Sequence, residues 1–445
     1  MTLALVAIFV GGYVCVALEH KLRVDKSAIA LLMFGAIWTV YACCSPDGLS
    51  ELVEHLGATC ETLVFLIGAM TIVEIIDSYG GFAFITERIT TRSKWRLLWV
   101  LAITTFLLSA ILDNMTTTII LIMMLRRIVP DSRDRVLYAS VIVMAANGGG
   151  AWSPIGDVST IMLWMRGNVT AVKLVLFLFV PCVVSLLVPT WFLSRRFDKH
   201  DMLGGDSTAM LDNRPDGVGR RFSLLVLVLG VLGLLFVPVF KSLTGLPPYV
   251  GVMISLGVLW VLTERFCDRK HMLPEDSKHR VSKLVKRIDI PVVLFLLGIL
   301  MSVAGLQSSG ILSDVAYLLD TYVHEVFVIS GIVGLFSSII DNVSLVAACI
   351  GMYPVSDFAT TVSVSVDPIY AQAFVQDGIF WLLLAYCAGV GGSMLIIGSA
   401  AGVVAMGLEK IDFTWYLKHI TPAMFAGYLS GMLVIFLEWW VCCRW

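Results

Sequence analysis

One short stretch decides how this chain folds, and it reads ANGGGAWSPIGDVST over residues 146–160. Three consecutive glycines, a proline and a further glycine are costly inside a regular helix. Apolar segments nevertheless flank the stretch on both sides. We therefore predict a discontinuous helix over residues 138–165, whose unwound middle exposes backbone carbonyls and helix ends.

The second half of the chain contains a similar stretch, GVGGSMLIIGS, at residues 389–399. It predicts another broken helix, over residues 375–406. Two further blocks of sequence also recur in the same order, one around Phe65 and Phe295 and one around Asp113 and Asp341. Three blocks in one order are unlikely to be chance, so they predict an internal repeat.

Composition places this repeat in a membrane. The chain has 445 residues, of which 58% are hydrophobic and 14% are charged. Soluble domains carry about 25% charged residues, so this chain has too few to coat a water-soluble enzyme of its size. An all-α polytopic membrane protein is the class that remains. Apolar stretches long enough to span a bilayer lie at 2–18, 28–43, 62–78, 138–165, 172–193, 222–240, 248–263, 290–307, 375–406 and 414–441.

Two other apolar stretches, 97–128 and 326–352, are too long for one crossing, and each has an Asp-Asn pair in its middle. Irregular, polar backbone at membrane depth is tolerated only inside protein or along a water-filled cavity. We therefore predict two re-entrant hairpins with the Asp-Asn pairs at their tips. The alternative, two extra spans joined by a short loop in each stretch, stays open.

The distribution of Lys and Arg predicts the orientation. Of the 31 Lys and Arg residues, 27 fall in the loops 19–27, 79–96, 126–135, 194–221, 264–289 and 407–418. Basic residues are retained on the cytoplasmic side, so these loops are expected there, with both termini outside a cytoplasmic (inner) membrane. A single crossing in place of either hairpin would disrupt this split, whereas two crossings would preserve it.

The same topology predicts how the halves relate. The first repeat covers 1–193, the second covers 222–445, and 194–221 is a cytoplasmic connector. Each half holds five crossings and one hairpin, and five is odd, so the second half must be inverted. Inverted repeats with interrupted helices at matching positions indicate a secondary transporter with its site near the midplane.

Oxygen-bearing side chains gather at the two tips and two breaks, and oxygen ligands suit a hard cation such as sodium. No Lys or Arg stands next to the tips or within the breaks, which disfavours an anionic substrate. The carboxylates are Asp113, Asp157 and Asp341, and the amides are Asn114, Asn147 and Asn342. The hydroxyls include Thr116, Thr117, Ser159, Thr160, Ser337, Ser344, Ser393 and Ser399.

Burial predicts how protons enter the reaction. A low-dielectric site favours the neutral form of a carboxyl group, so a buried Asp exchanges a proton more readily near neutral pH. Such a group can hold a proton or a sodium ion but not both, which gives antiport. Asp157 is expected to be the carrier because its counterpart in the repeat is Ser399. Asp113 and Asp341 are expected to be ligands, although N-capping of a helix without ion contact is an open alternative.

The stretches LDNMTT (112–117), NGGGAWSPIGDVST (147–160) and IDNVS (340–344) resemble those of NhaD-type sodium/proton antiporters, members of the ion transporter superfamily. The resemblance covers nearly the whole chain. It implies sodium/proton antiport with lithium as a second substrate, no cofactor, and a homodimer that moves as an elevator against a scaffold. Positions that match the family's functional polar residues are Asp113, Asn114, Asn147, Asp157, Ser159, Thr160, Ser337, Asp341, Asn342, Ser393 and Ser399, and Thr116 lies in the matching tip.

Two other functions are alternatives to this one. A related carrier for a dicarboxylate, citrate or an arsenite-like substrate is the first, and the three acidic residues without a basic one disfavour it. An intramembrane aspartyl protease is the second. It would need a Gly-x-Gly-Asp context, and Pro154 stands where the first glycine belongs. The sequence therefore favours a transporter of cations over an enzyme, with no nucleic-acid partner expected.

Overall fold

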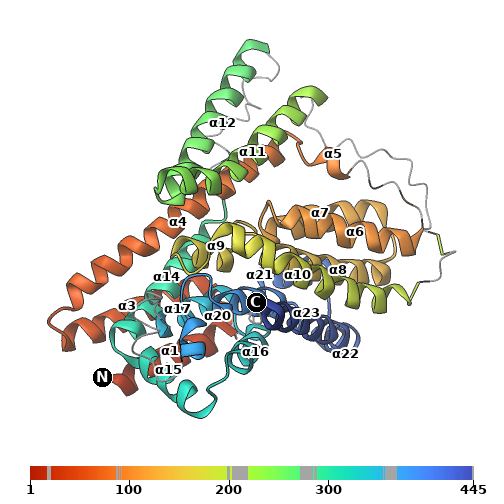
Figure 1. The fold of residues 1–445 in the computed structure, drawn as a ribbon. Helices are drawn as coiled ribbons and strands as arrows, with labels where there is room; N and C mark the ends of the chain where they lie inside the picture. The colour runs from red at the N-terminus through yellow and green to blue at the C-terminus, as the bar shows by residue number, and fades with distance from the viewer. Residues whose placement is uncertain are drawn as a thin grey trace. The chain divides into compact units, whose positions relative to one another are not determined.

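A computed structural model describes residues 1–17, 22–86, 89, 91, 93–197, 201–202, 219–270, 284, 288–353, 355 and 368–442. Within these ranges the regular elements are helices (Figure 1), and the one β-bridge is an isolated antiparallel pair, Ser93 with Met202. Six of the described helices are long and apolar enough to cross a membrane, namely α3, α4, α10, α11, α14 and α23. The chain is therefore a polytopic, all-helical membrane protein, as predicted.

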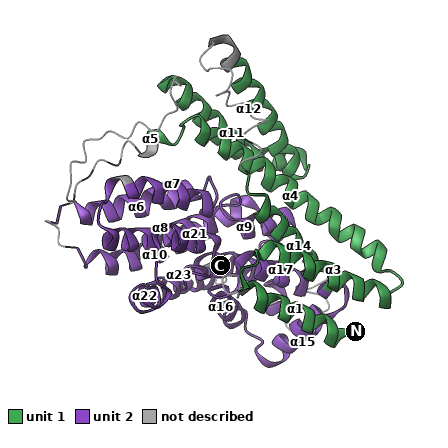
Figure 2. Cartoon of the chain, turned by 180° about the vertical axis from the view of Figure 1, so that it is seen from behind, with its two compact units in different colours: residues 1–90, 208–305 green, residues 91–207, 306–445 purple. Residues whose placement is uncertain are grey.

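The helices divide into two compact units, each built from two separate segments of the chain (Figure 2). Unit 1 contains residues 1–90 and 208–305, and unit 2 contains residues 91–207 and 306–445. Each of the repeats predicted from the sequence therefore contributes its first part to unit 1 and its later part to unit 2.

Unit 1 contains α1 (Thr2–Ala17), α3 (Lys26–Cys44), α4 (Gly48–Ser78), α5 (Ala83–Thr86), α11 (Arg220–Thr244), α12 (Pro248–Lys270) and most of α14 (Ile290–Ser308). Its two segments are joined by contacts between α3 and α14. The indole nitrogen of Trp38 donates to the carbonyl of Met301 at 2.7 Å. Gly298 lets the helices approach closely, because a Cβ there would lie 2.7 Å from the carbonyl oxygen of Ala30.

The first segment of unit 2 contains α6 (Lys94–Ser109), α7 (Asn114–Ile128), α8 (Ser132–Ala151), α9 (Val158–Met165) and α10 (Ala171–Ser194). Helix α8 contacts α6, α7 and α10, and the four lie side by side in Figure 1. The predicted hairpin over 97–128 is represented by α6 and α7, which are interrupted at residues 110–113. The predicted break in 138–165 falls between α8 and α9, at residues 152–157. The three glycines 148–150 were expected in the unwound middle, but they form the end of α8 because close packing of α8 on its neighbours leaves no room for side chains at Gly149 and Gly150.

The second segment of unit 2 contains α15 (Ile311–Tyr322), α16 (Val326–Ser337), α17 (Asn342–Met352), α19 (Pro368–Gln372), α20 (Ile379–Gly391), α21 (Ala400–Glu409), α22 (Phe413–His419) and α23 (Thr421–Cys442). Helices α16 and α17 are interrupted at residues 338–341, within the predicted hairpin 326–352. Helices α20 and α21 are interrupted at residues 392–399, within the predicted broken helix 375–406.

The two interrupted pairs are supported by the same contacts. Ser109, at the end of α6, donates its hydroxyl to the carbonyl of Ala146 at 2.6 Å. Ser337, at the end of α16, donates to the carbonyl of Ala388 at 2.7 Å. These residues occupy matching positions in the two sequence repeats. Each interrupted pair is therefore connected to its broken helix by an equivalent hydrogen bond.

The predicted spans and hairpins leave 44–61 and 308–325 as connecting loops, and both of these segments are partly helical. Helix α4 begins at Gly48, within the expected loop 44–61, and Tyr41 donates to the Glu51 carboxylate there at 2.8 Å. Helix α15 occupies much of the expected loop 308–325 and buries Ile311 and Leu312 on one face. Both segments are amphipathic, and a search for continuous apolar runs does not detect such helices.

Candidate functional site

The carboxylate of Asp157 lies at the centre of a buried polar network in unit 2. Asp157 is the N-cap residue of α9, and 2% of it is exposed. Its Oδ1 accepts two hydrogen bonds from Ser159, one from the backbone N–H and one from the hydroxyl, each at 3.0 Å. The local sequence explains this geometry, because Asp is a preferred N-cap and Gly156 precedes it where the chain has no room for a side chain.

The other oxygen of Asp157 joins the two halves of the chain. Asn114, the first residue of α7, donates its amide to Oδ2 at 2.7 Å. Asn342, the first residue of α17, donates its amide to the same Oδ2 at 2.9 Å. The two asparagines follow the matching residues Asp113 and Asp341. One carboxylate oxygen therefore receives equivalent donors from both interrupted pairs.

Asn147 extends the network to the second break. Its Oδ1 accepts from the Asn114 amide at 3.1 Å. Its own amide donates to the hydroxyls of Ser393 at 2.9 Å and Ser399 at 2.8 Å. Ser399 is the N-cap of α21 and accepts from the backbone N–H of Gly402, as Asp157 caps α9. The two breaks are thus linked through one buried asparagine.

The charge of this network is carried by Asp157. Four donors surround its two oxygens, which satisfies a carboxylate in its ionised, acceptor-only form. Among the residues that the structure describes, no Lys or Arg donates a hydrogen bond to these groups. A buried anion held by neutral amides and hydroxyls, without a cationic partner, is suited to exchanging a small cation or a proton.

The remaining predicted residues lie around the network with other partners. Asp113 accepts from the backbone N–H of Thr116 at 2.7 Å and from its hydroxyl at 2.5 Å, so it caps α7. Thr160 donates to the backbone carbonyl of Asp157, and Ser337 donates to a carbonyl of α20. Asp341 directly precedes α17. For these residues a role as ion ligands remains a prediction.

Two further hydroxyls stand out. Thr117 and Ser344 are buried, with exposed fractions of 0% and 2%, and they lie in the first turns of α7 and α17. Neither hydroxyl has a hydrogen-bond partner among the described residues. The sequence contained both but offered no signal to separate them from hydroxyls that hydrogen-bond to the helix backbone, as Thr118 does with Asn114.

The comparisons with known proteins agree with the geometry. The sequence model described as citrate transporter matches residues 13–371. "Sodium/proton antiporter 2" of Arabidopsis thaliana is 42% identical over 95% of this chain and 96% of its own length. "Sodium/proton antiporter 1" of the same plant is 43% identical over 96% of this chain and 71% of its own length. "Na(+)/H(+) antiporter NhaD" of Alkalimonas amylolytica is 30% identical over 96% of this chain and 89% of its own.

These matches extend over most of the chain and include both interrupted pairs. They place it among membrane transporters rather than enzymes. The chain therefore belongs to the citrate transporter family and is an NhaD-type transporter.

Proposed function

We propose that this protein exchanges sodium, and lithium as a second substrate, for protons across the cytoplasmic membrane, with Asp157 as the shared carrier. The observation that carries the proposal is the convergence of Asn114 and Asn342 on one oxygen of Asp157. The names of the relatives, sodium/proton antiporters, support sodium and protons as the substrates.

Competition for Asp157 gives the exchange. In the arrangement described here four donors stabilise the bare carboxylate. A sodium ion needs oxygen ligands, so it would displace the two amide nitrogens from Oδ2 and recruit the amide oxygens of the same asparagines. A protonated Oδ1 would instead donate a hydrogen bond to the Ser159 hydroxyl, because a hydroxyl can accept a hydrogen bond as well as donate one. Sodium and the proton both bind the negative charge of the Asp157 carboxylate, so binding of one excludes the other.

The fold supports alternating access. All the residues of the network belong to unit 2, and both units take one segment from each half of the chain. An inverted repeat with two re-entrant hairpins accounts for the paired interruptions at Asp113 and Asp341. We propose that unit 2 carries the ion, that the protein forms a homodimer, and that both termini face outside.

A carboxylate-bearing substrate is the second candidate, because the family model carries the description citrate transporter. The site does not favour it. A dicarboxylate would need cationic or hydrogen-donating partners, whereas the groups that meet at the break present an Asp carboxylate and hydroxyls already engaged by Asn147. Half-helix N-termini are then the remaining source of attraction for an anion.

The test is proton flux in vesicles that contain the purified protein and an internal pH dye. Sodium or lithium added outside is expected to move protons, whereas potassium and citrate are not. Asp157→Asn is expected to abolish the signal. Asp131→Asn is the matched control, because Asp131 also caps its helix by accepting the N–H two residues on at 3.0 Å, and it is exposed. Wild-type vesicles that move no protons with sodium, from mildly acidic to alkaline pH, would exclude the proposal.

A further inference from the structure

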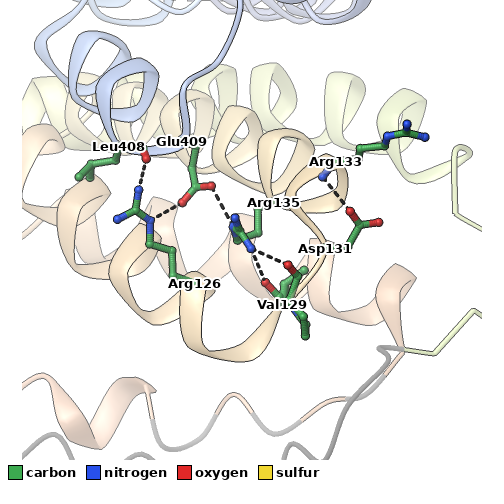
Figure 3. Close-up of polar contacts among 8 residues, drawn as sticks. Arg126, Val129, Asp131, Arg133, Arg135, Leu408 and Glu409 are labelled. Atoms are coloured by element: carbon green, nitrogen blue, oxygen red, sulfur yellow. Dashed lines mark hydrogen bonds and ion pairs between the residues drawn. The ribbon is translucent and has the colours of Figure 1, made fainter.

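A second ionic cluster lies in unit 2, at the ends of α7, α8 and α21 (Figure 3). The carboxylate of Glu409, the last residue of α21, is 2% exposed and stands between two guanidinium groups. Arg126 Nε donates to one carboxylate oxygen at 2.7 Å, and Arg135 Nε donates to the other at 2.9 Å. This carboxylate therefore fixes the position of both arginines.

Both arginines also donate to backbone carbonyls. Arg126 donates to Leu408, and one Arg135 nitrogen donates to Val129 and Pro130 at 3.1 and 2.7 Å. One terminal nitrogen of each guanidinium is left without a hydrogen bond within the described part of the chain. The arginines are thus held in place with donors still available.

Both arginines line an open cavity of about 650 Å³. The described residues of its wall are Arg126, Ser132, Arg133, Arg135, Val136, Leu408, Glu409 and Lys410. Four of these eight side chains are cationic and one is anionic, so the described wall carries an excess of three positive charges. Asp131, which caps α8 by accepting the backbone N–H of Arg133, does not contribute to the wall.

The chemistry of this wall favours a phosphate group. Guanidinium groups offer paired N–H donors that match phosphate oxygens, and a lysine adds a point charge. Unbalanced cations around one cavity repel each other, and an anion in the cavity would relieve this repulsion. The loops 126–135 and 407–418, which hold the cavity, were both predicted to face the cytoplasm, where anionic lipids enrich the adjacent leaflet.

We propose that this cavity binds a phosphate group, supplied by the headgroup of an anionic phospholipid or by free phosphate in the cytoplasm. The site is distinct from the Asp157 network, and its occupancy does not depend on the proposed exchange of sodium and protons. Such a ligand would bridge α7, α8 and α21 at the ends remote from the interruptions that adjoin these helices.

The experiment uses the full-length protein and two sources of phosphate. In detergent, the unfolding temperature is measured with inorganic phosphate and with sodium chloride of equal ionic strength. In lipid nanodiscs, native mass spectrometry compares retention of phosphatidylglycerol with that of phosphatidylcholine. The variant is Arg133→Gln combined with Lys410→Gln, since both side chains are exposed and neither pairs with Glu409. Lys418→Gln, on α22, is the matched control.

A rise in unfolding temperature with phosphate, above that with chloride, identifies free phosphate as a ligand. Selective retention of phosphatidylglycerol identifies a lipid headgroup. The affinity for either ligand is expected to fall about tenfold or more in the double variant, because two of the four cations are removed, and to be unchanged in Lys418→Gln. The proposal is overturned if the wild-type protein prefers neither ligand, or if the preference survives unchanged in the double variant.

Discussion

Asn342 donates its side-chain amide to Oδ2 of Asp157 at 2.9 Å, across 185 residues of the chain. Asn114 donates to the same oxygen at 2.7 Å from the corresponding position of the first half. One carboxylate oxygen therefore connects α7 with α17. In the proposed exchange an ion at Oδ2 would displace both amides, and ion binding would then be coupled to the relative positions of these two helices.

Asn342→Ala tests this coupling. In the proposed sodium complex the amide oxygen of Asn342 is a ligand, so its loss should raise the sodium concentration for half-maximal exchange about tenfold for each 1.4 kcal/mol of ligand interaction removed. The ion-free carboxylate also loses one of its four donors, and this loss opposes part of the effect. Dye-detected proton flux across a series of sodium concentrations measures the net change. Unchanged sodium dependence in a folded variant would contradict the ligand role.

The double variant Asn114→Ala with Asn342→Ala asks whether the two amides act on one group. Residues that share a partner show non-additive effects, with interaction energies of about 0.5–3 kcal/mol. We expect the loss of sodium affinity in the double variant to differ from the sum of the two single losses. Strict additivity would indicate that the two asparagines serve separate sites.

Gly149→Ala tests the packing that brings these residues together. A methyl group at Gly149 would overlap the backbone carbonyl of Phe106, and backbone cannot move aside cheaply. Overpacking of this kind costs about 1–3 kcal/mol or more, so a lower unfolding temperature and loss of transport are expected. Gly407→Ala is the control, because the space around Gly407 is open within α21. Alanine there should stabilise by up to about 1 kcal/mol.

The sequence alone predicted the four segments in which the chain is interrupted, because Asp-Asn pairs and stretches rich in Gly within apolar segments are conspicuous. It was wrong about the three consecutive glycines, which end α8 and do not lie in the interruption. It also selected Asn114, Asn147, Asp157 and Asn342, and the structure brings these four together by hydrogen bonds. The reason is that apolar segments contain few polar side chains. Those that are buried there must form hydrogen bonds with one another, because other partners are scarce.

Other features could not be predicted from the residue types. Asp113 and Asp157 each stand at the end of an interruption, and each caps the helix that follows. Only packing determines that the amides of Asn114 and Asn342 donate to Asp157. The sequence predicts a loop at 44–61, where α4 begins at Gly48, since the charged residues of this segment hide an amphipathic pattern. The bonds of Glu409 with Arg126 and Arg135 join residues more than 270 apart, which local sequence patterns do not reveal.

Glu409→Gln tests the ionic cluster at the end of α21. Removing the one carboxylate leaves the guanidinium groups of Arg126 and Arg135 without their counter-ion. Because these side chains are 44% and 21% exposed, water solvates them in part, and we expect a loss of about 1–3 kcal/mol. Chemical unfolding in detergent measures the loss. Asp134→Asn, which breaks the pair with Lys94 at 2.7 Å, is a milder comparison at about 1 kcal/mol or less. Equal losses of stability in both variants would contradict the idea that the Glu409 carboxylate stabilises the protein by pairing with two arginines.

Thr117→Val and Ser344→Ala distinguish ion ligands from structural hydroxyls. Both hydroxyls are buried without a hydrogen-bond partner in the described residues, so removing them should cost no stability, and relief of the unpaired group favours the variants. If they hold the ion or its water, the sodium concentration for half-maximal exchange should rise about tenfold while the unfolding temperature stays the same or increases. Thr118→Val is the control, since its hydroxyl is already bonded to the Asn114 carbonyl at 2.7 Å. A normal sodium dependence in both Thr117→Val and Ser344→Ala would restrict the ligand set to the network around Asp157.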